Sequence, residues 1–233
     1  MFVENREHLY AEKLATFFRA EKIGYTAVNR LENWFCASSF WRNVTRKQLL
    51  PWLVGDTELG DHVLELGAGP GAATEELRKR AGRVTSIEYS HDFAARLARL
   101  DNETNGAHNH RTKNGVSNIR VMNGAVLQGD ASALPFREKT FSAAIAILVL
   151  HHLRSPELQE RAFAEVFRVL KPGGTFLAVE IEDSWLNRVI HIRSTFVPVA
   201  AASISACLEA AGFARANIAL RSGAFRVRAV RPR

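Results

Sequence analysis

A strand that runs into a glycine-rich turn and then into a helix sets the first constraint on this chain of 233 residues. The segment reads Val63-Leu64-Glu65-Leu66-Gly67-Ala68-Gly69-Pro70-Gly71, and helical spacing follows from about residue 72 to residue 81. Glycine lets the backbone turn sharply and lets a ligand approach the main chain closely. Ligands of open α/β sheets lie across the carboxyl ends of the strands. The motif therefore predicts a ligand site at the end of the first strand.

Strand-like and helix-like segments alternate from residue 61 onward, which predicts a mostly parallel, doubly wound sheet. Strands are expected over 63–65, 84–88, 141–149, 175–179, 216–220 and 225–230, and two strand-like stretches, 118–122 and 126–128, stand where the third strand is expected. Further helices are expected over 91–100, 156–170 and 203–211. The last two strands are joined by a short turn, which indicates one antiparallel strand at an edge. The expected fold is α/β, with a seven-stranded sheet and N-terminal helices.

Two segments stand outside this alternation. Residues 1–58 are predicted to form a helical extension or lid in front of a domain over 59–233, because apolar residues recur there at helical spacing. The polar segment Asp101–Gly115 is predicted to be a surface loop. Its His108 and His110 are interpreted as solvated side chains, since no third ligand with suitable spacing accompanies them.

The net charge of +7 raises the question of an anionic partner. Residues 181–233 carry eight arginines and three acidic groups, so most of the excess lies at the C-terminal end. Phe225, Val227 and Ala229 alternate with Arg226 and Arg228, as in a half-buried strand. The favoured interpretation is the solvated face of a strand, and the alternative is an anion-binding surface.

Cysteine usage and hydropathy bear on the compartment. Cys36 and Cys207 are far apart, which argues against a disulfide scaffold or a zinc site and fits a reducing environment. The first residues are too polar for a secretory signal, and the longest apolar run, 141–150, is too short to span a bilayer. A cytoplasmic protein without a membrane span or metal site is expected.

The glycine turn alone does not name its ligand, because Gly67, Gly69 and Ala72 also satisfy a dinucleotide-binding pattern. Glu88 ends the second strand 19 residues after Gly69, where a carboxylate can accept the two hydroxyls of a ribose. Asp130 follows the third strand, where it can accept a hydrogen bond from an adenine amino group. Both features favour a nucleoside-containing cofactor.

Several motifs together resemble the class I S-adenosylmethionine (SAM)-dependent methyltransferases, in particular the type 11 branch with the ubiquinone/menaquinone-type enzymes. The resemblance runs from about residue 61 to the end and rests on four motifs besides the glycine turn and Glu88. These are Gly-Asp-Ala-x-x-Leu-Pro-Phe from Gly129, His151-His152-Leu153, Leu-Lys-Pro-Gly-Gly from Leu170, and Ala211-Gly212-Phe213. One departure is Ser142, where the family often has Asp.

The resemblance implies a Rossmann-like fold, SAM as cofactor and S-adenosylhomocysteine (SAH) as product. It assigns the methionine end of SAM to Glu65, Gly67, Ala68 and Gly69. It assigns the ribose to Glu88 with Tyr89 beside it, the adenine to Asp130 and Ala131, and the sulfonium pocket to residues near Leu148.

Candidate residues for chemistry and acceptor binding follow from the same placement. His152 or His151, just past the fourth strand, can act as a general base if the acceptor must lose a proton. The alternative is a structural role in closing the turn. Trp34 and Trp41 are candidates for the acceptor pocket, or else they pack on the sheet. Trp185 and His191 lie in another segment that often lines acceptor sites in the family.

Three other functions are weighed against a small-molecule methyltransferase. A nicotinamide-dependent oxidoreductase shares the first motifs, but no Tyr-x-x-x-Lys pair is present. A non-catalytic module could hold RNA or an acidic partner through the arginine-rich end. An RNA methyltransferase is a further alternative, although no Asn-Pro-Pro-Tyr-type motif follows the fourth strand. The sequence favours a small-molecule acceptor, and leaves open the acceptor atom (oxygen, nitrogen or carbon) and the oligomeric state.

Overall fold

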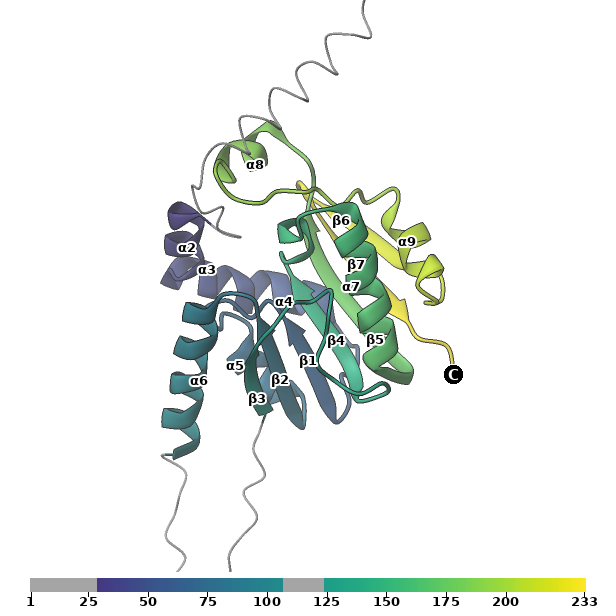
Figure 1. Ribbon diagram of the computed structural model, residues 1–233, viewed down its shortest axis with the longest axis horizontal. Helices are drawn as coiled ribbons and strands as arrows, with labels where there is room; N and C mark the ends of the chain where they lie inside the picture. The colour runs from purple at the N-terminus through teal and green to yellow at the C-terminus, as the bar shows by residue number, and fades with distance from the viewer. Residues whose placement is uncertain (1–28, 107–123) are drawn as a thin grey trace, which may run out of the picture.

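The computed structural model describes residues 29–106 and 124–233, which contain one seven-stranded sheet (Figure 1). The strand order is β3-β2-β1-β4-β5-β7-β6. The strands are β1 (His62–Leu66), β2 (Arg83–Glu88), β3 (Gly124–Gln128), β4 (Phe141–Ile147), β5 (Leu170–Ile181), β6 (Asn217–Arg221) and β7 (Ala224–Val230). The order reverses between β1 and β4, which is the switch point where doubly wound sheets bind ligands.

Strand directions match the predicted mixed sheet. β1 pairs in parallel with β2 and β4, β2 with β3, and β4 with β5. β7 runs antiparallel to both of its neighbours, β5 and β6. The single antiparallel strand is confirmed, and it lies one place in from the edge rather than at the edge itself.

Helices cover both faces of the sheet, as the doubly wound prediction requires. In Figure 1, α7 lies in front of the sheet and α4 behind it. The described helices are α2 (Arg30–Cys36), α3 (Ser39–Val44), the π-helical turn η1 (Thr45–Leu49), α4 (Leu50–Val54), α5 (Thr74–Arg80), α6 (His91–Gly106), the 3-10 turn η2 (Leu150–His152), α7 (Pro156–Val169), α8 (Trp185–Ile190) and α9 (Ile204–Ala210). None of these helices is long and apolar enough to cross a membrane.

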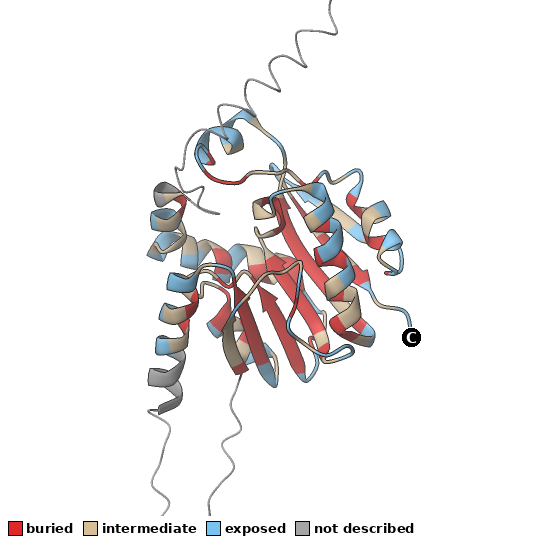
Figure 2. Ribbon diagram, in the orientation of Figure 1, coloured by how far each residue is buried: buried red, intermediate tan, exposed pale blue. Residues whose placement is uncertain are grey.

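Two hydrophobic clusters fill the spaces between sheet and helices. One joins Leu64 of β1 to Phe163 of α7 and Leu208 of α9. The other joins Val63, the preceding residue on the same strand, to Leu53 of α4 and to α5. Successive side chains of a strand point to opposite faces, so β1 contributes to both clusters. Figure 2 shows the buried residues concentrated in the central strands.

Some sequence predictions need correction or cannot be placed. The predicted loop Asp101–Gly115 is wrong for its first part, because α6 continues to Gly106. The favourable helical propensity of the residues before it carries the helix into a polar stretch. The rest of that loop, with His108 and His110, the predicted strand 118–122 and the N-terminal residues 1–28 lie outside the described residues.

The arginines of β7 have a structural use that the sequence did not reveal. Phe225, Val227 and Ala229 are buried as predicted. Arg226 donates to the carbonyl of Trp52, and Arg228 donates to the last carbonyls of α4, those of Leu53 and Val54, at 2.7–3.1 Å.

Arg231 does the same for the end of α7, where it donates to the carbonyls of Phe167, Arg168 and Leu170 at 2.6–3.1 Å. The last carbonyls of a helix lack partners within the helix, and cations near this end are stabilising. Three of the eight C-terminal arginines therefore hold helix ends, which removes them from a freely available anion-binding surface.

Candidate active site

A cavity of about 620 Å³ opens where the carboxyl ends of β1, β2, β3 and β4 meet. All the residues assigned by resemblance to the cofactor lie along its wall. The cavity is also lined by His151, His152, His191, Trp34 and Trp41. The structure does not bring Trp185 to it: this side chain is 76% exposed and is not among the lining residues.

The glycine turn has the backbone that its sequence predicts. Gly67, Gly69 and Gly71 have φ values of 60°, 52° and 85°, in the left-handed region that favours glycine. A Cβ on Gly67 would lie 2.5 Å from a methyl group of Val149, so this position requires glycine for space as well. A Cβ on Gly69 would meet no atom within 4 Å. The backbone at Gly69 is therefore open to a ligand in the cavity.

Glu88 links the end of β2 to this turn. Its Oε2 accepts the N–H of Gly69 at 2.7 Å, and its Oε1 accepts the N–H of Ser90 at 2.8 Å. A carboxylate offers about four lone-pair positions. Two remain for the hydroxyls of a bound ribose. Burial raises the pKa of Glu88 above its ordinary value.

Glu65 and Asp130 each accept two hydrogen bonds from neighbouring groups. Glu65 is buried, and its Oε2 accepts the hydroxyls of Thr74 and Ser86, both at 2.7 Å. Burial raises its pKa. Asp130 Oδ1 accepts the N–H and the hydroxyl of Ser132, each at 2.8 Å, which closes a turn after β3. The second oxygen of Asp130 keeps its capacity to accept a donor from a ligand.

Leu148 marks the point where β4 reaches the cavity. Its φ is 57°, an uncommon conformation for a branched residue. The backbone is held there because its N–H donates to Val179 of β5 at 2.9 Å. Such strain clusters at functional sites.

His151 is held by a buried carboxylate that sequence reasoning missed. Its Nδ1 lies 2.6 Å from Oε2 of Glu180, and both side chains are buried. The other oxygen of Glu180 accepts the N–H groups of Val149 at 2.9 Å and Leu150 at 2.7 Å. The carboxylate of Glu180 thus holds the backbone of the turn after β4 and also fixes the orientation of the His151 ring. A signal was present: Glu180 is an acidic residue within the apolar run of β5.

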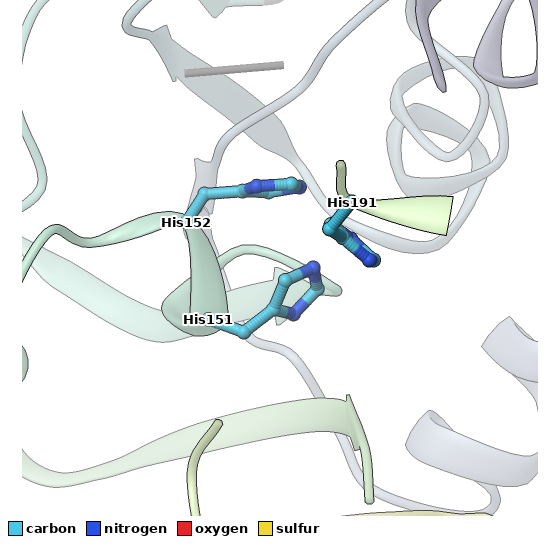
Figure 3. A group of neighbouring side chains, drawn as sticks. All are labelled: His151, His152 and His191. Carbon is cyan, nitrogen blue, oxygen red and sulfur yellow. The ribbon is translucent and has the colours of Figure 1, made fainter. Parts of the chain in front are cut away.

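His152 and His191 complete a group of three imidazoles (Figure 3). His152 Nδ1 lies 3.1 Å from the carbonyl of Thr195, and His191 Nδ1 lies 2.6 Å from that of Asn187. Ring centroids are 4.2 Å apart for His151–His152, 5.1 Å for His151–His191 and 5.5 Å for His152–His191. Burial lowers the pKa of His191. The structure thus places His191 beside the two histidines of the turn.

The N-terminal helices supply an aromatic wall. Phe35 and Trp41 have ring centroids 5.2 Å apart, and both line the cavity with Trp34. Cys36 also lines it, and its thiol has a pKa raised to about 11 by burial and by the charges of Glu32 and Glu88.

The first turn of α2 is tied to the segment after β5. Asn29 and Glu32 form a capping box: Glu32 N–H donates to Asn29 Oδ1 at 2.9 Å, and Asn29 N–H donates to Glu32 Oε2 at 2.8 Å. Asn29 Nδ2 also donates to the carbonyls of Ile190 and Ile192, at 2.9 and 3.1 Å. The hydroxyl of Ser194 donates to Glu32 Oε1 at 2.6 Å. Residues more than 160 positions apart therefore close the same side of the cavity.

Comparison with known proteins agrees with this site. A family model described as "Methyltransferase domain" matches residues 64–178, which span β1 to β5. A demethylmenaquinone methyltransferase of Thermobifida fusca is 31% identical over 141 residues, 60% of this chain and 50% of that protein. The ubiquinone/menaquinone biosynthesis C-methyltransferase UbiE of Erwinia tasmaniensis is 26% identical over 73% of this chain and 59% of its own.

A further relative has a different acceptor in its name. A tRNA (carboxymethyluridine(34)-5-O)-methyltransferase of Arabidopsis thaliana is 48% identical over 65 residues, 26% of this chain and 16% of that protein. The chain thus spans about half the length of the Thermobifida relative and less of the Arabidopsis one.

Solved structures share the fold. An N-methyltransferase, NodS, from Bradyrhizobium japonicum in complex with SAH superposes with a TM-score of 0.62 at 19% identity, over 89% of this chain and 95% of that chain. A chain from the complex of the Haloferax volcanii Trm112 methyltransferase activator with a methyltransferase superposes with a TM-score of 0.60 at 18% identity. The superposition covers 88% of this chain and 100% of that chain.

The doubly wound sheet, the glycine turn and the carboxylates at successive strand ends define a domain of the SAM-dependent methyltransferase class. The family match and the relatives agree with this definition, and the chain belongs to the class I SAM-dependent methyltransferases. SAM is the cofactor of this family. The open backbone at Gly69 and the accepting capacity of Glu88 and Asp130 fit such a cofactor.

Proposed function

We propose that this protein transfers a methyl group from SAM to a small acceptor that carries a largely apolar ring. The observation that supports this proposal is that one cavity joins the glycine turn, Glu88 and Asp130 to an aromatic wall and three histidines. Pockets of this kind, mostly apolar with a few convergent polar groups, bind small molecules. The quinone-related relatives act on ring compounds by name, which agrees with this acceptor class.

In this proposal the cofactor supplies an activated methyl sulfonium, and the chain supplies alignment and exclusion of water. Glu65, Gly67, Ala68 and Gly69 bind the methionine end, and Leu148 borders the sulfonium pocket. Glu88 and Tyr89 bind the ribose, and Asp130 and Ala131 bind the adenine. Trp34 and Trp41 hold the acceptor. Correct alignment can lower the barrier by roughly 7–11 kcal/mol.

An acceptor that must lose a proton also needs a base, and we assign that role to His152 with His151 beside it. A hydrogen bond from His152 Nδ1 to Thr195 O places the accepting lone pair on Nε2. His151, held by Glu180, is the more rigid of the two and positions the neighbouring ring. His191 completes the polar end of the pocket.

A tRNA nucleoside is the second candidate acceptor, and the 48% identity to the Arabidopsis tRNA methyltransferase favours it. The internal use of Arg226, Arg228 and Arg231 weighs against it, because phosphate binding relies on available cations. A nucleic-acid acceptor would need other basic residues, or a partner protein such as the activator in the Haloferax complex.

The test measures SAH release by the full chain with reduced quinone precursors and, separately, with total tRNA. We expect turnover with a ring compound that is lost in Glu88→Ala and retained in Glu75→Ala, an exposed carboxylate of α5. Turnover with tRNA and not with any ring compound would show that the acceptor is a tRNA nucleoside instead of a small ring compound. Failure of the wild-type chain to bind SAH in a calorimetric titration would contradict the proposed activity itself.

A further inference from the structure

His151, His152 and His191 bring three potential metal ligands to one point of the cavity wall. One nitrogen from each imidazole lies within 4.8 Å of the others. Figure 3 shows the rings facing one another, two from the turn after β4 and one from the end of α8. The third ligand comes from 39 positions downstream of His152, so no sequence spacing could have indicated this group.

Each ring has an oxygen acceptor at the same atom. Nδ1 of His151 faces the Glu180 carboxylate at 2.6 Å, that of His152 faces Thr195 O at 3.1 Å, and that of His191 faces Asn187 O at 2.6 Å. A ring that donates from Nδ1 carries its lone pair on Nε2. Histidines that bind metals usually donate their other ring N–H to a carboxylate or a carbonyl in this way.

The surrounding charge suits a cation. Glu180 is fully buried against His151, and Glu32 Oε1 lies 3.6 Å from Nε2 of His191. Two carboxylates so close to three imidazole ligands suit the charge of a divalent ion. Arg154 is the one Lys or Arg among the described residues that line the cavity.

We propose that these three histidines bind a divalent transition-metal ion such as Zn²⁺ within the cavity. Zinc–nitrogen distances are about 2.0–2.1 Å, so tetrahedral binding would draw the three nitrogens to about 3.4 Å from one another. Three protein ligands leave a coordination position open, as in catalytic zinc sites. This inference rests on the proposed methyl transfer. With the ion bound, Nε2 of His152 would be a metal ligand instead of a base, and the open position would take an oxygen of the acceptor, which would then lose its proton to solvent more readily. The acceptor would accordingly be an oxygen-bearing ring compound.

Packing alone offers a competing explanation of the cluster. His191 stacks on Phe196 at 4.5 Å between centroids, and His151 meets the same ring edge-on at 5.6 Å. Packing requires only the flat shape of the rings, whereas ion binding requires all three imidazoles. Substitutions that keep size but remove the nitrogen ligands therefore separate the two explanations.

The test uses the full chain without an affinity tag, treated with chelator and titrated with Co²⁺, whose visible absorption reports its ligands. We expect Co²⁺ to bind with a spectrum of low coordination number and to be displaced by Zn²⁺. His191→Phe should weaken binding at least about 100-fold, and Glu180→Gln about 10- to 100-fold. Retained SAH affinity shows that each variant is folded.

Two controls make the result decisive. His91→Ala removes an exposed histidine of α6 and should leave Co²⁺ binding unchanged. The double variant His108→Ala/His110→Ala removes the other closely spaced histidines of the sequence and should also have no effect. The proposal is overturned if wild-type and His191→Phe chains bind Co²⁺ equally, or if the double variant is the one that loses it.

Discussion

The two sides of the cavity are built in different ways. The cofactor side consists of strand ends and the turns that directly follow them, so its assigned residues lie within 84 positions, from Glu65 to Leu148. The acceptor side brings together α2, the turn after β4 and the end of α8, and α2 is more than 100 positions away from the other two. A local motif can therefore specify the first side, whereas the second exists only once the sheet has formed.

The largest effect is expected from Gly69→Arg, which blocks the cofactor side alone. The side chain would enter the open space at Gly69 and reduce SAH affinity at least about 100-fold, while the positive φ costs about 1–2 kcal/mol of stability. Calorimetry measures the affinity. Gly223→Arg is the matched control, since Gly223 also has a positive φ and open surroundings but lies in the β6–β7 turn. Equal SAH affinity in the two variants would show that the glycine turn does not contact the cofactor.

His152→Ala tests the acceptor side alone. If His152 accepts a proton, kcat should fall about 100-fold or more, because general-base contributions are of that size. SAH affinity should change less than about threefold. The acid limb of the kcat–pH profile should also disappear, and a purely structural role would not produce that change. An unaltered kcat would contradict the base role and leave His152 a structural role in the cavity wall.

Arg228→Ala probes the attachment to the sheet of α4, the helix that follows α2 and α3 in the chain. Loss of the bonds to Leu53 O and Val54 O leaves the end of α4 without its donors, which should lower the free energy of unfolding by about 1–2 kcal/mol. Denaturant unfolding measures it. Arg215→Ala, at an exposed position, should be neutral. Equal stability of the two variants would contradict the capping role.

The last prediction concerns a chemical probe of the acceptor side, the thiol of Cys36 at the end of α2. Since the thiolate is the reactive form and the pKa is raised to about 11, alkylation at neutral pH should be about 100-fold slower than for an ordinary thiol. The rate should rise about tenfold per pH unit up to that pKa. Mass spectrometry of the Cys36 peptide gives the rate, and saturating SAH should reduce it further. Rapid, pH-independent labelling would show that the thiol is not buried as described.

The sequence predicted the sheet and the cofactor side because their signals are local. Buried strands, glycines with positive φ and acidic strand ends can each be identified from a few neighbouring residues. The roles of Glu180 and Glu32 could not be predicted from sequence. Glu180 meets His151 only because β4 and β5 pair, and Glu32 meets Ser194 only because its capping box with Asn29 holds it at the start of α2. Trp185 was selected by its region alone, and its ring lies in solvent. The internal use of the β7 arginines likewise depends on where α4 ends.

The bonds from Asn29 to Ile190 and Ile192, and from Arg228 to α4, also constrain the order in which the molecule can assemble. During synthesis the helices that bear the aromatic wall emerge before the sheet, and their partners are made more than 160 residues later. Contacts of such long sequence separation form slowly, because the closure entropy of the intervening chain must be overcome first. The nascent chain would then complete its cofactor turn early and its acceptor pocket last. A ribosome-stalled chain that ends before β7 should accordingly bind SAH before it gains the full stability of its N-terminal helices.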